Sequence, residues 1–274
     1  MTAIAPAYAT LRLVRGTAVA MSALLTLLGA RLAGTDGDLP AMLLAAAAVA
    51  FATAGGNALN DVYDRQVDRV NRADRPIPSG AIGVGPARGV AALGLLAATV
   101  CAAFLSLWCL AICVANCGLL VVYARHSKRL GLLKGVIVGY LVASAVLFGA
   151  LGPARVDGVL LTLAVCAGLA TLAREIVKDI EDIAGDRSVG ARTLPLRLGI
   201  PASRRVADLA LVAAVALSFV PWPAGMPGPA PFALLIAGGA ILGLSLAVAD
   251  AGRAQRLIMA GSVVEMAAFL VAAA

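Results

Sequence analysis

The chain has 274 residues, of which 61% are hydrophobic and 14% are charged, and its mean hydropathy is +0.95. A soluble globular domain is closer to half apolar and a quarter charged, so this composition excludes a soluble single domain. It also excludes a disordered chain, and the continuous apolar runs argue against a membrane β-barrel, whose strands alternate. The remaining class is a bundle of membrane-spanning helices, each of which needs roughly 20 apolar residues.

Nine apolar runs, separated by short charged breaks, predict nine membrane-spanning helices in a single domain that covers residues 1–274. In chain order the runs are 13–34, 40–60, 87–106, 108–124, 133–152, 157–177, 206–222, 230–249 and 255–273. The break between the third and fourth runs, near Ser106 and Trp108, is weak, so eight spans is the nearest alternative. The predicted fold class is all-α, a polytopic membrane bundle.

The basic residues test this span count. If the N-terminus lies in the cytoplasm, every Lys and Arg except Arg31 and Arg155 falls on a cytoplasmic segment. The positive-inside rule requires such a bias. We therefore expect an integral protein of the cytoplasmic membrane with its N-terminus inside and its C-terminus outside. The net charge of +7 then follows mostly from topology, and no nucleic-acid partner is expected.

Most of the acidic residues lie in two cytoplasmic segments, 61–88 and 174–205. If the second span continues as a helix into the first segment, Asn60, Asp64 and Asp68 are spaced i, i+4 and i+8 and share one face. Like charges stacked in this way repel each other, and a divalent cation removes that cost. Oxygen ligands favour Mg²⁺, which commonly takes one or two carboxylates together with substrate phosphate.

The second segment repeats the arrangement. Asp179, Asp182 and Asp186 are spaced i, i+3 and i+7, again on one face of a continuous helix. We expect the two helical stripes to face each other and to hold Mg²⁺ ions between them on the cytoplasmic side of the bundle.

Arginine and lysine residues are interleaved with both stripes. Carboxylates, a divalent cation and guanidinium groups at the mouth of an apolar bundle indicate a site for a diphosphate with a hydrocarbon tail. Two other interpretations stay open. The charges form salt-bridge networks that anchor the loops, or they form the cation site of a transporter, although transporters place such sites near the membrane midplane.

Asn116 and Glu265 are polar side chains near the middle of predicted spans. Asn116 predicts a hydrogen bond between helices or a polar position on a pocket wall. Glu265 is a functional candidate because an ionisable group is expensive in the membrane, and a protonated, hydrogen-bonded carboxyl group is the alternative.

The segments NDVYDRQVDRVNRADRPIPSG and REIVKDIEDIAGDRSVGARTLP resemble the two acidic motifs of the UbiA superfamily of intramembrane prenyltransferases. They look most like the digeranylgeranylglyceryl phosphate synthase branch. The resemblance implies nine transmembrane helices, two Asp-rich cytoplasmic helical loops, and Mg²⁺ as the cofactor. It also implies a polyprenyl diphosphate, most simply geranylgeranyl diphosphate, as the donor and a lipophilic molecule as the acceptor, both within the lipid bilayer.

The resemblance also implies roles for individual residues. The implied magnesium ligands are Asn60, Asp64, Asp68, Asp179, Asp182 and Asp186, and the aspartates among them are the implied catalytic residues. The implied diphosphate ligands are Arg72, Arg75, Tyr123, Lys128 and Lys178, of which Tyr123 and Lys128 come from the segment YARHSKR. A Tyr at a helix end is also a common membrane anchor.

Two places depart from the pattern of close relatives. Ala18 stands where relatives carry an Asn in the first span, and Lys134 and Gly135 stand where relatives tend to have a Gly-Asn pair that opens the fifth span. These departures predict a less polar acceptor pocket, and therefore a poor fit for a glyceryl phosphate acceptor. The main functional expectation is a Mg²⁺-dependent prenyltransferase. The alternative is a UbiA-type terpene cyclase, in which a double bond of the same chain captures the cation and no external acceptor is used.

Overall fold

The computed structural model describes residues 4–35, 37–152, 155–221 and 228–272, and every regular element in these ranges is a helix. The all-α prediction is therefore confirmed for the described part of the chain. The helices are α1 (Ile4–Val14), α2 (Gly16–Leu32), α3 (Leu39–Asn71), α4 (Val84–Ala103), α5 (Leu107–His126), α6 (Leu132–Phe148), α7 (Gly158–Glu181), α8 (Ile183–Ser188), α9 (Leu194–Leu198), α10 (Ile200–Ser218), α11 (Pro229–Ala247) and α12 (Ala251–Ala272).

Six helices within the described ranges are long and apolar enough to cross a membrane, namely α3, α4, α5, α7, α11 and α12. The count becomes seven if α1 and α2, which meet at a bend of 54°, form one span. Each of the nine predicted runs overlaps a helix, but α6 has only 17 residues and α10 carries Arg204, Arg205 and Asp208. Nine spans thus remain a prediction.

The weak break after the third predicted span is a real helix end. α4 ends at Ala103 and α5 begins at Leu107, and the side chain of Ser106 caps α5 by accepting a hydrogen bond from the Cys109 backbone N–H at 3.1 Å. A serine at this position satisfies one of the N–H groups that a helix start leaves unpaired. The third and fourth predicted runs are therefore separate helices and do not merge into one, as the alternative of eight spans had assumed.

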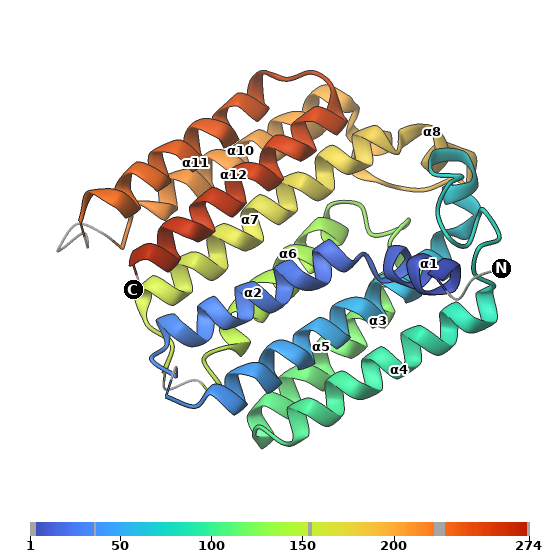
Figure 1. Cartoon of the computed structure of the whole chain (residues 1–274). Helices are drawn as coiled ribbons and strands as arrows, with labels where there is room; N and C mark the ends of the chain where they lie inside the picture. The colour runs from blue at the N-terminus through green and yellow to red at the C-terminus, as the bar shows by residue number, and fades with distance from the viewer. Residues whose placement is uncertain (1–3, 36, 153–154, 222–227, 273–274) are drawn as a thin grey trace.

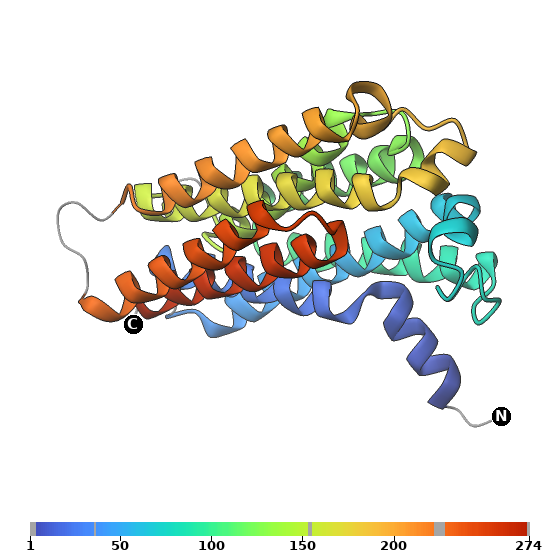
Figure 2. The ribbon, with the colours of Figure 1, turned by 90° about the horizontal axis from the view of Figure 1, so that it is seen from above.

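The long helices run side by side, and the segments that carry the two acidic motifs meet at one end of the bundle (Figure 1). We call this the motif end. α8 packs there against α3, next to the loop that joins α3 to α4. α1 begins at the motif end and α12 finishes at the opposite end (Figure 1). In the view from above, α1 projects away from the other helices (Figure 2).

Glycines allow neighbouring helices to approach closely, which is typical of packing in lipid. A Cβ atom at Gly29 of α2 would lie 2.0 Å from the carbonyl oxygen of Val146 in α6, and one at Gly139 of α6 would lie 2.6 Å from that of Gly168 in α7. No side chain fits at these crossings. By contrast, large apolar side chains such as Leu107 remain exposed on the outer surface, as expected for helices that face lipid.

Candidate active site

The first acidic stripe lies on one continuous helix. α3 runs from Leu39 to Asn71 without a break, so the second predicted span continues into the charged segment as expected. Asn60, Asp64 and Asp68 are all buried, and the Asn60 Nδ2 donates a hydrogen bond to Asp64 Oδ2 at 3.0 Å. The motif end of α3 therefore presents a row of amide and carboxylate oxygens.

The second stripe does not lie on one continuous helix, and this part of the sequence-based prediction is wrong. α7 ends at Glu181, Asp182 forms the junction with φ −84° and ψ 5°, and α8 begins at Ile183. Asp179 consequently belongs to the last turn of α7, and Asp186 belongs to α8. After the break, α8 packs against α3.

The side chain of Asn71 joins the two motifs. Its Nδ2 donates to the carbonyl oxygen of Asp182 at 2.9 Å, and its Oδ1 accepts from the Gly185 backbone N–H at 2.9 Å. An added Cβ at Gly185 would lie 2.4 Å from Asn71 Nδ2, so a larger residue there would displace the Asn71 amide. Asn71 thereby fixes the turn between α7 and α8 relative to the end of α3.

Lys128, which follows α5, lies between the two acidic stripes. Its Nζ is 2.9 Å from Asp186 Oδ1 and 3.8 Å from Asp64 Oδ1. One cation thus contacts a carboxylate from each motif, at the position where a bridging ion is expected.

Asp182 pairs with Lys178 at 3.0 Å and with Arg72 at 3.3 Å. Burial acts to raise the pKa of Asp182, but the two cations outweigh it and lower the pKa to about 2. The carboxyl group is therefore ionised at neutral pH.

The donor set fits a magnesium site. Among the described residues, no three His, Cys, Asp or Glu side chains already converge on one point, because lysines and arginines separate the carboxylates. However, Asn60 Oδ1 and Asp186 Oδ2 are buried and have no hydrogen-bond partner. Buried polar atoms are normally paired, and an oxygen-only set of amide and carboxylate groups matches the preference of Mg²⁺.

Asp179 has a different environment from the other aspartates. It forms an ion pair with Lys134 of α6, which also lies 3.6 Å from Glu175. Lys134 is only 2% exposed. The sequence placed Lys134 at the start of a span and assigned it no role, since nothing in a linear pattern indicates that α6 and α7 enclose it.

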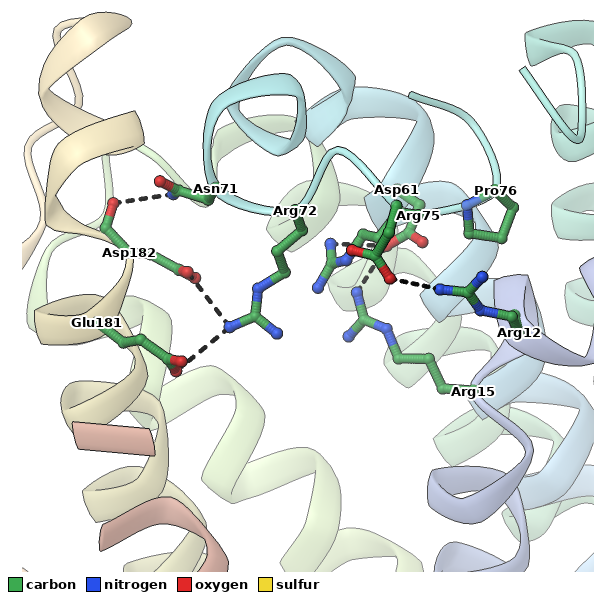
Figure 3. A pocket seen from close by; sticks show the side chains of 10 residues that line it. Arg12, Arg15, Asp61, Asn71, Arg72, Arg75, Pro76, Glu181 and Asp182 are labelled. Atoms are coloured by element: carbon green, nitrogen blue, oxygen red, sulfur yellow. Dashed lines mark hydrogen bonds and ion pairs between the residues drawn. The ribbon is translucent and has the colours of Figure 1, made fainter. Parts of the chain in front are cut away.

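A pocket of about 470 Å³ opens at the motif end, and we call it the arginine pocket (Figure 3). Arg12, Arg15 and Arg75 lie on one side, and Arg72 with its partners Glu181 and Asp182 lies on the other (Figure 3). The complete lining is Arg12, Arg15, Asp61, Asn71, Arg72, Asp74, Arg75, Pro76, Glu181 and Asp182.

Asp61 positions two of these arginines. This carboxylate, only 3% exposed, accepts from Arg15 Nη2 at 2.6 Å and from Arg75 Nη1 at 3.3 Å. Arg75 also donates to Asp68 at 2.7 Å. Arg15 lies at the bend between α1 and α2 with a φ of 56°, a left-handed conformation that costs energy in a residue other than glycine.

A second cavity, of about 530 Å³, extends from the motif end into the bundle, and we call it the chamber. Its charged end is lined by Arg15, Asn60 and Lys178, and its deep end by Phe148 and Phe269. Arg15 lines both cavities, so a molecule with an anionic head and a hydrocarbon tail has room for each part.

Polar side chains also lie on the chamber wall. Asn116 of α5 donates to Ser144 Oγ of α6 at 2.7 Å, which confirms the predicted hydrogen bond between helices, and it lines the chamber as well. Glu265 is buried on the same wall, and its Oε1 has no hydrogen-bond partner.

The five predicted diphosphate ligands occupy three neighbouring places. Arg72 and Arg75 line the arginine pocket, Tyr123 and Lys178 line the chamber, and Lys128 contacts both acidic stripes. Tyr123 is thus a pocket residue as well as a residue at the end of a span.

Several residues that sequence reasoning did not assign contribute to the site, among them Arg15, Asp61, Asn71 and Lys134. Asp61 and Asn71 lie within the first motif segment, so their positions beside the stripe were the available signal. Arg15 and Lys134 come from other helices and had no comparable signal.

Comparison with known proteins assigns the family. The sequence pattern of the UbiA prenyltransferase family matches residues 22–261. This chain belongs to the UbiA prenyltransferase family. A curated digeranylgeranylglyceryl phosphate synthase from Methanopyrus kandleri is 41% identical over 270 residues, which cover 95% of this chain and 97% of the relative. A protein of the same name from Haloquadratum walsbyi is 39% identical over 260 residues, covering 93% and 91% of the two chains.

Solved UbiA structures share the fold. The structure of a digeranylgeranylglyceryl phosphate synthase is 28% identical, with a TM-score of 0.76 over 98% of each chain. A UbiA homologue from Archaeoglobus fulgidus bound to GPP and Mg²⁺ is 18% identical, with a TM-score of 0.68 over 96% of this chain and 99% of that one. Together with its long apolar helices, this UbiA fold makes the chain an integral membrane protein.

Proposed function

We propose that this UbiA protein is a Mg²⁺-dependent intramembrane prenyltransferase that ionises a polyprenyl diphosphate and transfers the prenyl group to a lipophilic acceptor. The observation that carries the proposal is the junction of two cavities. The charged motif end, where both acidic motifs meet, opens into an apolar chamber, and Arg15 lines both. This arrangement suits a substrate with a diphosphate head and a hydrocarbon tail.

Bound Mg²⁺ would neutralise charge on the departing diphosphate. The residues proposed to hold it on the first motif are Asn60, Asp64 and Asp68. Those proposed on the second motif are Asp182 and Asp186. The unpartnered Asn60 Oδ1 and Asp186 Oδ2 support this choice.

The protein's own cations would bind the same leaving group. Lys128 and Lys178 place ammonium charges next to the carboxylates, and Arg72 adds a guanidinium group. Charge stabilisation of the leaving group is usually the largest contribution to such a reaction. Tyr123, on the chamber wall, is proposed to orient the diphosphate with its hydroxyl group.

The chamber would hold the hydrocarbon chain and exclude water from the allylic cation, which prevents hydrolysis. Lys178 and Leu163 line it at opposite ends of α7. They are 15 residues apart, a separation that corresponds to about 22 Å along a helix. A long isoprenoid, such as the geranylgeranyl group in the names of the curated relatives, fits this depth better than a short one.

For the acceptor we propose a prenylated glyceryl phosphate, the class in the names of those relatives. In the sequence, Ala18 and Gly135 argued against this acceptor. Ala18 does line the chamber, but Gly135 is not among the lining residues, so it takes no polar group away from the chamber wall. The phosphate of this lipid also has candidate partners outside the chamber. Arg12 and Arg15 in the arginine pocket offer guanidinium donors at the motif end, and guanidinium groups bind phosphate in bidentate fashion.

One assay tests the reaction and its alternative. Purified protein is incubated with Mg²⁺ and geranylgeranyl diphosphate, with and without geranylgeranylglyceryl phosphate. The expected products are digeranylgeranylglyceryl phosphate and diphosphate, formed only with acceptor. Diphosphate release with a cyclic hydrocarbon in the absence of acceptor would instead identify a terpene cyclase.

We also propose that the motif end faces the cytoplasm, with the N-terminus inside and the C-terminus outside. The basis is the bias of basic residues toward one set of loops. Ala81, exposed in the loop after α3, offers a test. An Ala81→Cys variant is expected to react with a membrane-impermeant thiol reagent in inverted vesicles and not in intact cells, and the reverse result would invert the topology.

A further inference from the structure

The most enclosed cation of this protein is not among those that line the arginine pocket. Lys134, at the start of α6, is 2% exposed, and its Nζ forms ion pairs with Glu175 and Asp179 of α7. The two helices are in close contact here, because a Cβ atom at Gly135 would lie 2.7 Å from Leu172 Cδ1. The ammonium group is thus held between α6 and α7 with two carboxylates as its counter-ions.

The aspartates around the end of α7 contact different parts of the protein. Asp179 contacts Lys134 of α6. Asp182, at the junction after α7, instead contacts Lys178 and Arg72 at 3.0 and 3.3 Å. The backbone is still helical up to Asp182, whose N–H bonds to the Lys178 carbonyl oxygen. The two carboxylates therefore differ in the cations that surround them, Lys134 for Asp179 and Lys178 with Arg72 for Asp182.

We infer that Asp179 is the counter-ion of Lys134 and not a magnesium ligand, so that Asp182 and Asp186 alone represent the second motif in the metal site proposed above. Withdrawing Asp179 toward a metal would break a buried ion pair, which is strongly destabilising. Asp186 Oδ2, in contrast, is buried without a partner. Lys134 is then a positioning residue, because it determines which carboxylates face the metal.

The test compares two matched variants, Asp179→Asn and Asp182→Asn, in the full-length protein in detergent. Mg²⁺ binding in the presence of inorganic pyrophosphate is measured by calorimetry, and unfolding by a thermal melt. We expect Asp179→Asn to lower the melting temperature and to change the Mg²⁺ dissociation constant by less than about threefold. Asp182→Asn is expected to weaken Mg²⁺ binding by more than about tenfold, since it removes a charged ligand.

Lys134 variants give a readout that a merely structural role would not change. Lys134→Met removes a positive charge and releases Asp179, so Mg²⁺ binding is expected to strengthen, by about threefold or more. Lys134→Arg, which keeps the charge, is expected to retain the wild-type constant. If Lys134→Met does not fold, the double variant Lys134→Met/Asp179→Leu replaces the buried pair with apolar groups. It is expected to fold and to bind Mg²⁺ with the wild-type constant.

The outcomes separate this inference from the proposed function on which it rests. Equal weakening of Mg²⁺ binding by Asp179→Asn and Asp182→Asn, or weaker Mg²⁺ binding by the double variant, would make Asp179 a ligand and overturn the inference while leaving the prenyltransferase intact. Unchanged or weaker Mg²⁺ binding by a folded Lys134→Met variant would show that Lys134 does not hold Asp179 away from the metal, and would likewise overturn the inference. Absence of Mg²⁺ binding in the wild-type protein with pyrophosphate would instead contradict the proposed function.

Discussion

The contact between Asn71 and the turn after α7 supports a double-mutant prediction. Asn71→Ala removes the hydrogen bonds to the Asp182 carbonyl oxygen and from the Gly185 N–H, both 2.9 Å long. Gly185→Ala removes the same bonds from the other side, because the new Cβ would lie 2.4 Å from Asn71 Nδ2 and displace the amide. The two variants therefore break one shared interaction.

The magnitude follows from the two bonds. A hydrogen bond contributes about 0.5–1.5 kcal/mol net, so each single variant is expected to lose about 1–3 kcal/mol of unfolding free energy. The double variant should lose little more than either single variant, since the alanine at position 71 leaves room for the Cβ at position 185. The expected coupling energy is thus about as large as a single effect, whereas independent sites would add.

The assay is chemical unfolding of the detergent-solubilised protein, together with kcat/KM for the prenyl diphosphate. We expect kcat/KM to fall in both single variants, because the turn carries Asp182 toward the first motif. Gly89→Ala is the matched control, since its Cβ meets no atom within 4 Å on α4, and alanine there should be neutral or stabilising by up to about 1 kcal/mol. Additive losses in the double variant would refute the argument that Asn71 joins the two motifs.

Three further predictions concern the site. Asp64→Asn should keep the wild-type melting temperature but lower turnover by about 100-fold or more, because it removes a charged metal ligand. EDTA should abolish wild-type activity until Mg²⁺ is restored, and normal turnover by Asp64→Asn would contradict the ligand set. Arg72→Ala should raise the KM for prenyl diphosphate by about tenfold or more without changing the product, and an altered product at unchanged KM would place Arg72 beside the hydrocarbon chain instead. Arg15→Gln should raise the KM for geranylgeranylglyceryl phosphate by about tenfold or more. Arg88→Gln changes an exposed residue of α4 and serves as the control, for which the same KM should stay unchanged. Equal effects of the two variants would argue against an acceptor phosphate in the arginine pocket.

Local periodicity was sufficient for part of the site. The row of Asn60, Asp64 and Asp68 followed from helical spacing, because α3 is regular to Asn71 and neighbours at i and i+4 share a face in any helix. The interhelical bond of Asn116 was also predictable, since a buried amide in a span requires a partner.

The second motif shows where such reasoning stops. Spacing predicted one helical face for Asp179, Asp182 and Asp186, but the helix breaks at Asp182. The contacts that accompany the break are long-range, from Asn71 in α3 to Gly185 in α8. No local pattern contains that information, because the two residues are more than a hundred positions apart.

The sequence by itself determined the helical membrane class, the first carboxylate row and the family, because composition, helical period and motif residues are local properties. Only the tertiary structure decided the partners of the charges. The buried Lys134 forms an ion pair with Asp179. Arg15, which pairs with Asp61, lines both cavities. Ion pairs depend on distances between helices that pack in three dimensions, and the energy of a buried charge depends on what surrounds it.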